Sequence, residues 1–135
     1  MSATGRKGTL MLLSRLSRIA MRATPEAEMG MSLRHYMALY FIPKAVPQQE
    51  LSELLCIDSN NTVILLNELE RIGWIRRERD PEDRRRHVVL LTDEGLAAFT
   101  QAQQARDVID DDVLGSLSLE ERETLHELLA KALGR

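Results

Sequence analysis

The sequence predicts a mainly α-helical fold with one small β-hairpin, and three observations support this fold class. Apolar residues recur at helical spacing over most of the chain. Aromatic residues make up only 4% of the chain, so the core must rest on Leu, Ile, Val, Met and Ala, which favours helices packed on helices. The third observation is one pair of short β-like runs, 74–79 and 87–91, joined by an Asp-Pro turn with three consecutive arginines.

The size and composition are those of a single globular domain, residues 1–135, with its own core. The single cysteine, Cys56, excludes an intramolecular disulfide framework. No stretch approaches the ~20 apolar residues that span a bilayer. The short apolar run 10–13 is followed by Arg15 and Arg18, unlike a signal peptide. We therefore expect a cytoplasmic protein.

Two helices are predicted in the first third of the chain. Residues 9–23 form an amphipathic helix, ended by Thr24-Pro25. Ser32 is expected to cap a second helix, which stops before Pro43. The residues that recur at helical spacing in the first helix are Leu10, Leu13, Leu16, Ser17 and Ala20, and the apolar members of the second are Leu33, Tyr36, Met37, Leu39 and Tyr40.

A short helix and a longer one follow, with a tight turn between them. Pro47 opens the short helix, which runs to Leu55, and Asp58 or Ser59 caps the longer one. Gly73 ends the longer helix, because glycine adopts the left-handed conformation of a helix C-terminus without steric cost. Its predicted buried stripe is Thr62, Leu65, Leu66, Leu69 and Ile72.

Beyond the hairpin, two further helices complete the chain. Thr92 is expected to cap a long helix, and the capping-box pattern 118–121 begins a final helix that runs to about residue 133. The apolar positions of the long helix are Leu96, Phe99, Ala102, Ala105, Ile109 and Val113.

The order of these elements predicts a winged helix-turn-helix over 32–91. The helices 47–55 and 59–72 have helix-turn-helix spacing, and the hairpin adds the wing. The helices in 9–23 and 93–133 carry apolar faces that this small unit could not cover. We therefore expect them to be dimerisation helices that bury these faces against a second copy.

Charge is distributed unevenly along the chain. The net charge is −3, yet residues 71–92 hold seven arginines against four acids, while 93–135 hold ten acids against four basic residues. A local positive patch on an acidic body can steer one face toward DNA. An ordinary solvated charged surface is the alternative interpretation.

Three ordered segments resemble the MarR family of bacterial transcription regulators. They are Leu69-Glu70-Arg71-Ile72-Gly73-Trp74-Ile75-Arg76-Arg77, then Asp80-Pro81-Glu82-Asp83-Arg84-Arg85, then Leu91-Thr92-Asp93-Glu94-Gly95. The resemblance extends from about Leu10 to Leu133 and includes the start of the last helix. It implies a homodimer whose two winged helices read a palindromic promoter site, acting as a repressor. It also implies that Arg85 reaches the minor groove, that Asp83 holds Arg85 in place, and that a small aromatic or phenolic effector binds, for which Arg15, Tyr36 and Tyr40 are candidates.

The predicted DNA contacts lie on the hairpin tip and the fourth helix. A narrow minor groove attracts arginine, which selects Arg84, Arg85 and Arg86, although a solvated tip with internal ion pairs would look the same. Ser59, Asn60 and Asn61 occupy the first helical turn, where amides can pair with adenine or simply cap the helix; Asn67 is a further candidate. Val63 and Ile64 could contact thymine methyl groups, whereas Glu68 would repel phosphate.

Other chemistry finds little support in the sequence. His35, His87 and His126 are isolated, so we predict no metal site and no cofactor. The sequence has no glycine-rich phosphate loop, no nucleophile elbow and no plausible acid pair, so we predict no enzymatic activity. Cys56 is expected to be a small buried hydrophobe, with a redox sensor as the alternative. A winged-helix protein–protein module that has lost specific DNA binding is the alternative function, because Val63, Ile64 and Glu68 are unusual in a recognition helix.

Overall fold

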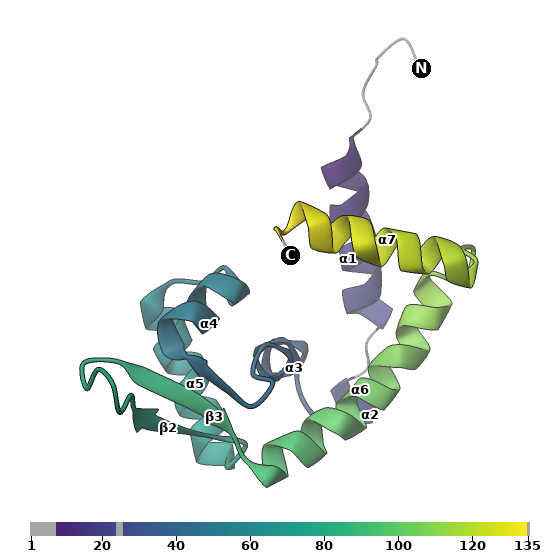
Figure 1. The fold of residues 1–135 in the computed structure, drawn as a ribbon. Helices are drawn as coiled ribbons and strands as arrows, with labels where there is room; N and C mark the ends of the chain where they lie inside the picture. Colours follow the sequence, from purple (N-terminus) through teal and green to yellow (C-terminus); the bar gives the residue numbers. More distant parts are fainter. Residues whose placement is uncertain (1–7, 24–25, 135) are drawn as a thin grey trace. The chain divides into compact units, whose positions relative to one another are not determined.

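The computed structural model describes residues 8–23 and 26–134 and contains seven α-helices and three β-strands within these ranges (Figure 1). The chain divides into two compact units, residues 1–24 with 106–135, and residues 25–105. The elements in order are α1 (Thr9–Ala23), α2 (Glu26–Met29), α3 (Leu33–Tyr40), β1 (Ala45–Pro47), α4 (Gln48–Leu55), α5 (Ser59–Ile72), β2 (Ile75–Arg79), β3 (His87–Leu91), α6 (Asp93–Val113) and α7 (Leu119–Ala132). The predicted mainly helical fold with a hairpin is confirmed.

Local capping signals fix most helix ends at the predicted positions. The Ser32 hydroxyl accepts a hydrogen bond from the His35 backbone N–H at 3.1 Å, and Ser118 begins α7 with a complete capping box. Asp58, rather than Ser59, caps α5. Gly73 ends α5 with φ of 98°, a conformation that favours glycine. The predicted end of the first helix at Thr24-Pro25 lies outside the described residues.

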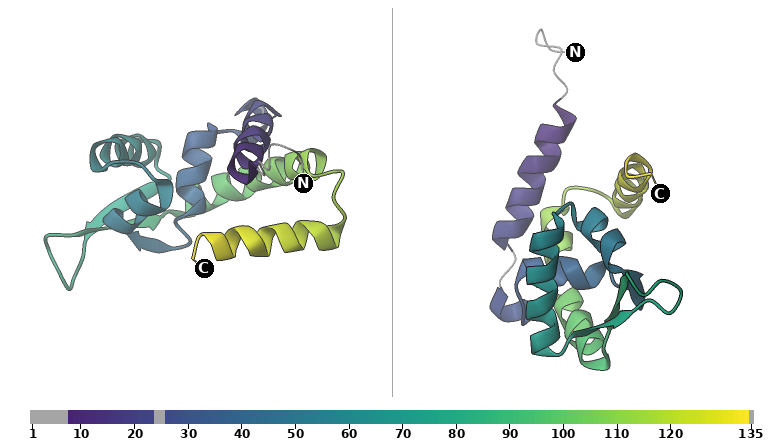
Figure 2. Two further views of the ribbon diagram at one scale, coloured as in Figure 1. Left: turned by 90° about the horizontal axis from the view of Figure 1, so that it is seen from above. Right: turned by 90° about the vertical axis from the view of Figure 1, so that its left-hand side faces the viewer.

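The hairpin of β2 and β3 belongs to a three-stranded antiparallel sheet with the order β1-β3-β2. The predicted hairpin is confirmed, and its 80–86 loop projects away from the helices of this unit (Figure 2). The sequence analysis missed β1, in which Ala45 pairs with Leu90 and Pro47 with Val88. It also missed the short helix α2. Elements of three or four residues are too short to show a periodic pattern.

The core of the 25–105 unit is aliphatic, as predicted. Leu51, Leu66 and Leu69 are fully buried, and Thr62, the one buried polar residue of the described chain, donates to the Asp58 carbonyl at 2.8 Å. One predicted position of the buried stripe is wrong, because Ile72 is 45% exposed. At about 100° per residue, Ile72 falls at the edge of this stripe.

The helices of the other unit leave much apolar surface uncovered. Neither α1 nor α7 has a buried residue. The residues of α1 that are half-buried include Leu13, Leu16 and Ala20, which belong to the predicted stripe. Leu10, Met11, Leu12, Leu119, Leu128 and Leu133 are each more than half exposed. Apolar side chains of this size, exposed together, are typical of a surface that binds another protein.

Candidate nucleic-acid interface

The wing loop holds one arginine in a defined orientation. Arg85 is 91% exposed, and its Nε and Nη2 atoms donate to the Asp83 carboxylate at 3.2 and 3.3 Å. The backbone N–H of Arg85 also donates to Asp83, at 3.1 Å. These hydrogen bonds from Arg85 lower the pKa of Asp83. The structure therefore contains the expected contact, with a carboxylate that stays ionised and directs an otherwise solvated guanidinium.

The rest of the loop is closed by its own backbone. The Asp80 N–H donates to the Arg86 carbonyl at 2.9 Å, and the Arg79 guanidinium donates to the Arg84 carbonyl at 2.7 Å. The side chains of Arg84 and Arg86 are exposed and donate no hydrogen bond to any described residue. The turn thus presents three guanidinium groups at one tip, and only that of Arg85 is held by a carboxylate.

The first turn of α5 presents polar side chains to solvent. The Asn61 amide donates to the Asp58 carboxylate at 3.0 Å, so part of this amide belongs to the cap. The Asn60 side chain makes no hydrogen bond with the described part of the chain, which leaves both its donor and its acceptor available. Val63 and Ile64, one turn further along, are 38% and 51% exposed. All four side chains remain predicted DNA contacts.

Asn67, by contrast, is tied to the wing. The Arg77 Nη2 atom donates to Asn67 Oδ1 at 2.6 Å and to Glu70 Oε1 at 2.8 Å, and the Arg77 backbone N–H donates to Glu70 at 3.1 Å. The side-chain hydrogen bond from Arg77 lowers the pKa of Glu70. This contact between β2 and α5 was missed, because ten residues separate Asn67 from Arg77 and no local pattern links them. The amide oxygen of Asn67 thus helps to fix the wing against α5.

The negative charge of Glu68, which was expected to repel a DNA phosphate, is paired within the fold. Its Oε2 atom lies 3.0 Å from Nη1 of Arg34 and 3.0 Å from Nε2 of His35, both on α3. The hydrogen bond with His35, and then the charge of Arg34, lower the pKa of Glu68. The expected conflict with a nearby phosphate is therefore reduced, because the carboxylate is already shared by two donors.

Known proteins with this sequence pattern identify the family. The model of the MarR family matches residues 42–87. The transcriptional regulator HosA of Escherichia coli O111:H- is 41% identical over 69 residues, 51% of each protein. The HTH-type transcriptional regulator BilQ of Clostridium symbiosum is 32% identical over 97 residues, 71% of this chain and 67% of BilQ. The chain belongs to the MarR family.

Solved MarR structures share the fold. A mutant of MarR from E. coli, complexed with operator DNA, superposes with a TM-score of 0.77 at 23% identity and covers 94% of each chain. The likeness places the same winged helix in both proteins. The chain spans about half the length of HosA, the relative matched above.

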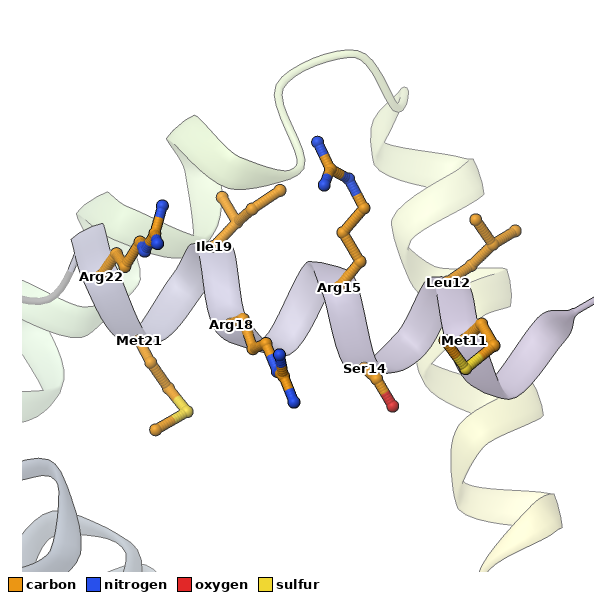
Figure 3. A pocket seen from close by; sticks show the side chains of 8 residues that line it. All are labelled: Met11, Leu12, Ser14, Arg15, Arg18, Ile19, Met21 and Arg22. Atoms are coloured by element: carbon orange, nitrogen blue, oxygen red, sulfur yellow. The ribbon is translucent and has the colours of Figure 1, made fainter.

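The effector residues suggested by the MarR resemblance lie in different units. Arg15 lines an open hollow along α1 with Met11, Leu12, Ser14, Arg18, Ile19, Met21 and Arg22. Figure 3 shows Leu12, Arg15 and Ile19 directed to one side of the helix, and Ser14, Arg18 and Met21 to the other. Tyr36 is buried and stacks on Phe99 with ring centroids 5.1 Å apart, whereas Tyr40 is 51% exposed. The role of all three in binding an effector stays a prediction.

Cys56 differs from the expectation. Its side chain is exposed, so the predicted buried hydrophobe is wrong. Cys56 ends α4 with φ of 55°, and a residue at this left-handed position turns the chain between two helices, where it faces solvent instead of the core.

None of the described helices is long and apolar enough to cross a membrane. Nor do the described side chains gather three His, Cys, Asp or Glu residues that could hold a metal ion.

Proposed function

We propose that this protein is a DNA-binding transcriptional regulator that acts as a homodimer on a palindromic promoter site. The observation that carries the proposal is the pairing of two elements in one unit. A recognition helix exposes a polar first turn with Asn60 uncommitted, and the adjacent wing ends in Arg85 held by Asp83. Family membership supports the same function, since the relatives named above are transcriptional regulators.

In the proposed complex each copy contacts two grooves. The first turn of α5 enters the major groove, where an asparagine amide can pair with both N6 and N7 of adenine. Arg85 enters the neighbouring minor groove, whose negative potential is strongest where the groove is narrow. Two copies related by a two-fold axis would read half-sites about one helical turn, ~10 bp, apart. Occupying a promoter in this way would repress transcription.

The second copy would cover the apolar surfaces of α1 and α7. Leu10 and Met11 are 76% and 73% exposed on α1, and Leu119 and Leu133 are 80% and 79% exposed on and just after α7. A monomer that left these side chains in water would forfeit the free energy of burying them, about 25 cal/mol per Å² of apolar surface. Dimerisation through the terminal helices recovers this free energy. The dimer interface also sets the distance between the two recognition helices.

A small aromatic or phenolic effector would control this distance. The ligand would favour a dimer conformation whose recognition helices no longer match successive major grooves, which lowers DNA affinity by population shift. Arg15, Tyr36 and Tyr40 are the candidates for recognising its carboxylate or phenol ring. Thermal stabilisation of the free protein by such compounds, together with release of bound DNA, is the expected signature of this effector.

The test is selection of a binding site from random duplexes and from DNA upstream of the protein's own gene, followed by gel-shift titration. Wild type should select a palindrome, and its affinity should fall by orders of magnitude between ~50 and ~200 mM salt. Arg85→Ala should weaken binding by several-fold, on the order of 1 kcal/mol or more. Its melting temperature should not change, because the guanidinium is exposed.

Arg76→Gln is the matched control, because it removes one positive charge from β2 at a side chain that is 60% exposed and, among the described residues, pairs only with Glu78. Failure to select any duplex, or an affinity that is insensitive to salt, would refute the proposal. That outcome would favour a protein–protein module instead. An Arg85→Ala variant that binds as tightly as Arg76→Gln would refute the role assigned to the wing arginine.

A further inference from the structure

Helix α5 exposes two apolar side chains that the core of its own unit does not use. Val63 and Ile64 are 38% and 51% exposed, whereas the neighbouring Thr62 and Leu65 are buried. Both exposed residues are β-branched, and a β-branched side chain loses χ1 freedom in a helix. Neither helix propensity nor core packing therefore accounts for this pair, which points to a ligand that offers apolar surface.

Both side chains lie on the same face of α5 as Asn60. Residues three and four positions apart are neighbours on a helix surface, so Val63 and Ile64 stand one turn beyond Asn60. Two further exposed residues, Asn67 and Arg71, continue this face towards the end of α5. The apolar pair is thus flanked by polar side chains. It is a small patch, whereas an apolar surface that binds another protein measures roughly several hundred Å².

The polar members of this face favour adenine. The Asn60 side chain makes no hydrogen bond with the described part of the chain, so it can both donate and accept, as a bidentate contact with adenine requires. Asn67 cannot make that contact, because its Oδ1 atom already accepts from Arg77 at 2.6 Å. Helix α5 carries no lysine or arginine before Arg71, and these are the residues that pair with guanine. The face therefore matches adenine, whose partner thymine presents a C5-methyl group in the major groove.

We propose that Val63 and Ile64 contact the C5-methyl groups of pyrimidines in the major groove, beside the adenine that Asn60 contacts. The proposal rests on the proposed function, because it requires α5 to enter that groove. The spacing of the residues fits this arrangement. Side chains one helical turn apart are separated by about 5–6 Å and successive base pairs by about 3.4 Å, so the methyl group lies about one or two base pairs from that adenine.

The ligand class is the 5-methylpyrimidine, which has two sources in DNA, thymine and 5-methylcytosine. Both carry the methyl group at C5, which faces the major groove, whereas uracil and cytosine lack it. A hydrocarbon side chain gains apolar contact from the methyl group and nothing from the hydrogen-bonding groups beside it. Binding that depends on this contact should therefore distinguish thymine from uracil, and it should also respond to methylation of cytosine.

The experiment replaces each thymine of the selected duplex, one at a time, with deoxyuridine, which removes the methyl group and keeps every hydrogen-bonding group. At a contacted position, wild type should bind about fourfold more weakly when one half-site is changed and about fifteenfold when both are changed. Ile64→Ala and Val63→Ala should weaken binding to the thymine duplex. At the position that each side chain contacts, uracil should then cost the variant less than about twofold, because the apolar contact is already lost.

Ile72→Ala is the matched control, because it truncates the same residue type on the same helix at a similar exposure of 45%. Ile72 lies about 12 Å beyond Ile64 along the helix axis. This variant should bind as wild type does and keep the full loss on uracil. All three alanine variants should keep the wild-type salt dependence, because no charge is removed. Their melting temperatures should not fall, since alanine is the better helix former at exposed positions.

A second arm distinguishes the two sources of the methyl group. The contacted T·A pair is replaced by a C·G pair, with either cytosine or 5-methylcytosine. Wild type should bind the methylated duplex about fourfold more tightly than the unmethylated one, and the alanine variant of the contacting residue should bind both equally. If 5-methylcytosine binds no better than cytosine, a contact that depends on the methyl group alone is overturned.

The outcomes separate the methyl contact from the proposed function. If wild type binds no duplex, both are overturned. If wild type binds a selected palindrome but tolerates uracil at every thymine, only the methyl contact is overturned. A loss on uracil that persists in full in both Ile64→Ala and Val63→Ala would also overturn it, because the methyl group would then be contacted by other residues.

Discussion

The Gly95→Ala substitution tests the contact that closes the base of the wing. A Cβ atom at Gly95 would lie 2.0 Å from the carbonyl oxygen of Trp74, and Cβ contacts under 3.0 Å essentially do not occur. The alanine methyl therefore requires a displacement of about 1 Å or more. The surroundings cannot yield easily, because Trp74 O also accepts from the Thr92 N–H at 3.0 Å, and the Thr92 hydroxyl donates to Gly73 O at 2.7 Å.

The cost follows from these contacts. Overpacking of a well-packed site costs about 1–3 kcal/mol, and loss of one backbone hydrogen bond about 1 kcal/mol more. Unfolding entropy of about 2.1 cal/mol/K per residue amounts to about 0.28 kcal/mol/K for this chain length. A loss of about 2–4 kcal/mol therefore lowers the melting temperature by about 7–14 °C.

Thermal unfolding followed by circular dichroism at 222 nm measures this change. Gly115→Ala is the control, because its nearest contact, Asp112 O, lies at 3.2 Å and needs to move by only a few tenths of an ångström. Its melting temperature should fall by less than about 3 °C. If Gly95→Ala melts within 2 °C of Gly115→Ala, the close approach of Gly95 to Trp74, and the reasoning built on it, would be wrong.

Two further predictions concern acid stability and assembly. The hydrogen bond from Arg77 lowers the pKa of Glu70 below its ordinary 4.5, so the stability from this pair is present above pH 4.5 and is lost as the pH falls through the lowered folded-state value. In urea unfolding, wild type should exceed Glu70→Gln at pH 7 and converge with it toward pH 3; a difference that does not depend on pH would contradict this. The double variant Met11→Glu with Leu12→Glu should shift a dimer to a monomer in light scattering at micromolar concentration, whereas Leu96→Glu, at an exposed leucine of the other unit, should not; a double variant that remains dimeric would exclude α1 from the interface.

The features that the sequence predicted well are those with local causes. Caps, terminating glycines and the two strands of the hairpin depend on residues within a few positions of each other, and Ser32, Asp58 and Gly73 lie where expected. The missed features depend on partners that are distant in the chain. Strand β1 exists because β3 supplies its hydrogen bonds, and Arg77 meets Asn67 only once the register of β2 against α5 is set.

The adjacent arginines of the wing also differ in a way that the sequence alone does not predict. Arg86 could be selected from the sequence as one of three arginines at a turn, but nothing in the local pattern distinguishes it from Arg85. The distinction arises from Asp83, whose carboxylate accepts hydrogen bonds from Arg85, whereas Arg86 acts on it only through its charge. A hydrogen-bonding difference between neighbours is thus a property of the folded chain.

The net charge of −3 is a poor guide to the side of the protein on which we propose that DNA binds. Glu68 is shared by Arg34 and His35, and Glu70 is engaged by Arg77. These carboxylates accept hydrogen bonds from basic side chains within the fold. Their negative charges are therefore partly cancelled at close range, and their repulsion of a distant phosphate is weak. At the wing tip only Arg85, of the described arginines 84–86, forms a salt bridge. Internal pairing of the acids and exposure of the arginines therefore give an acidic protein a locally positive face, which is what binding to a polyanion requires.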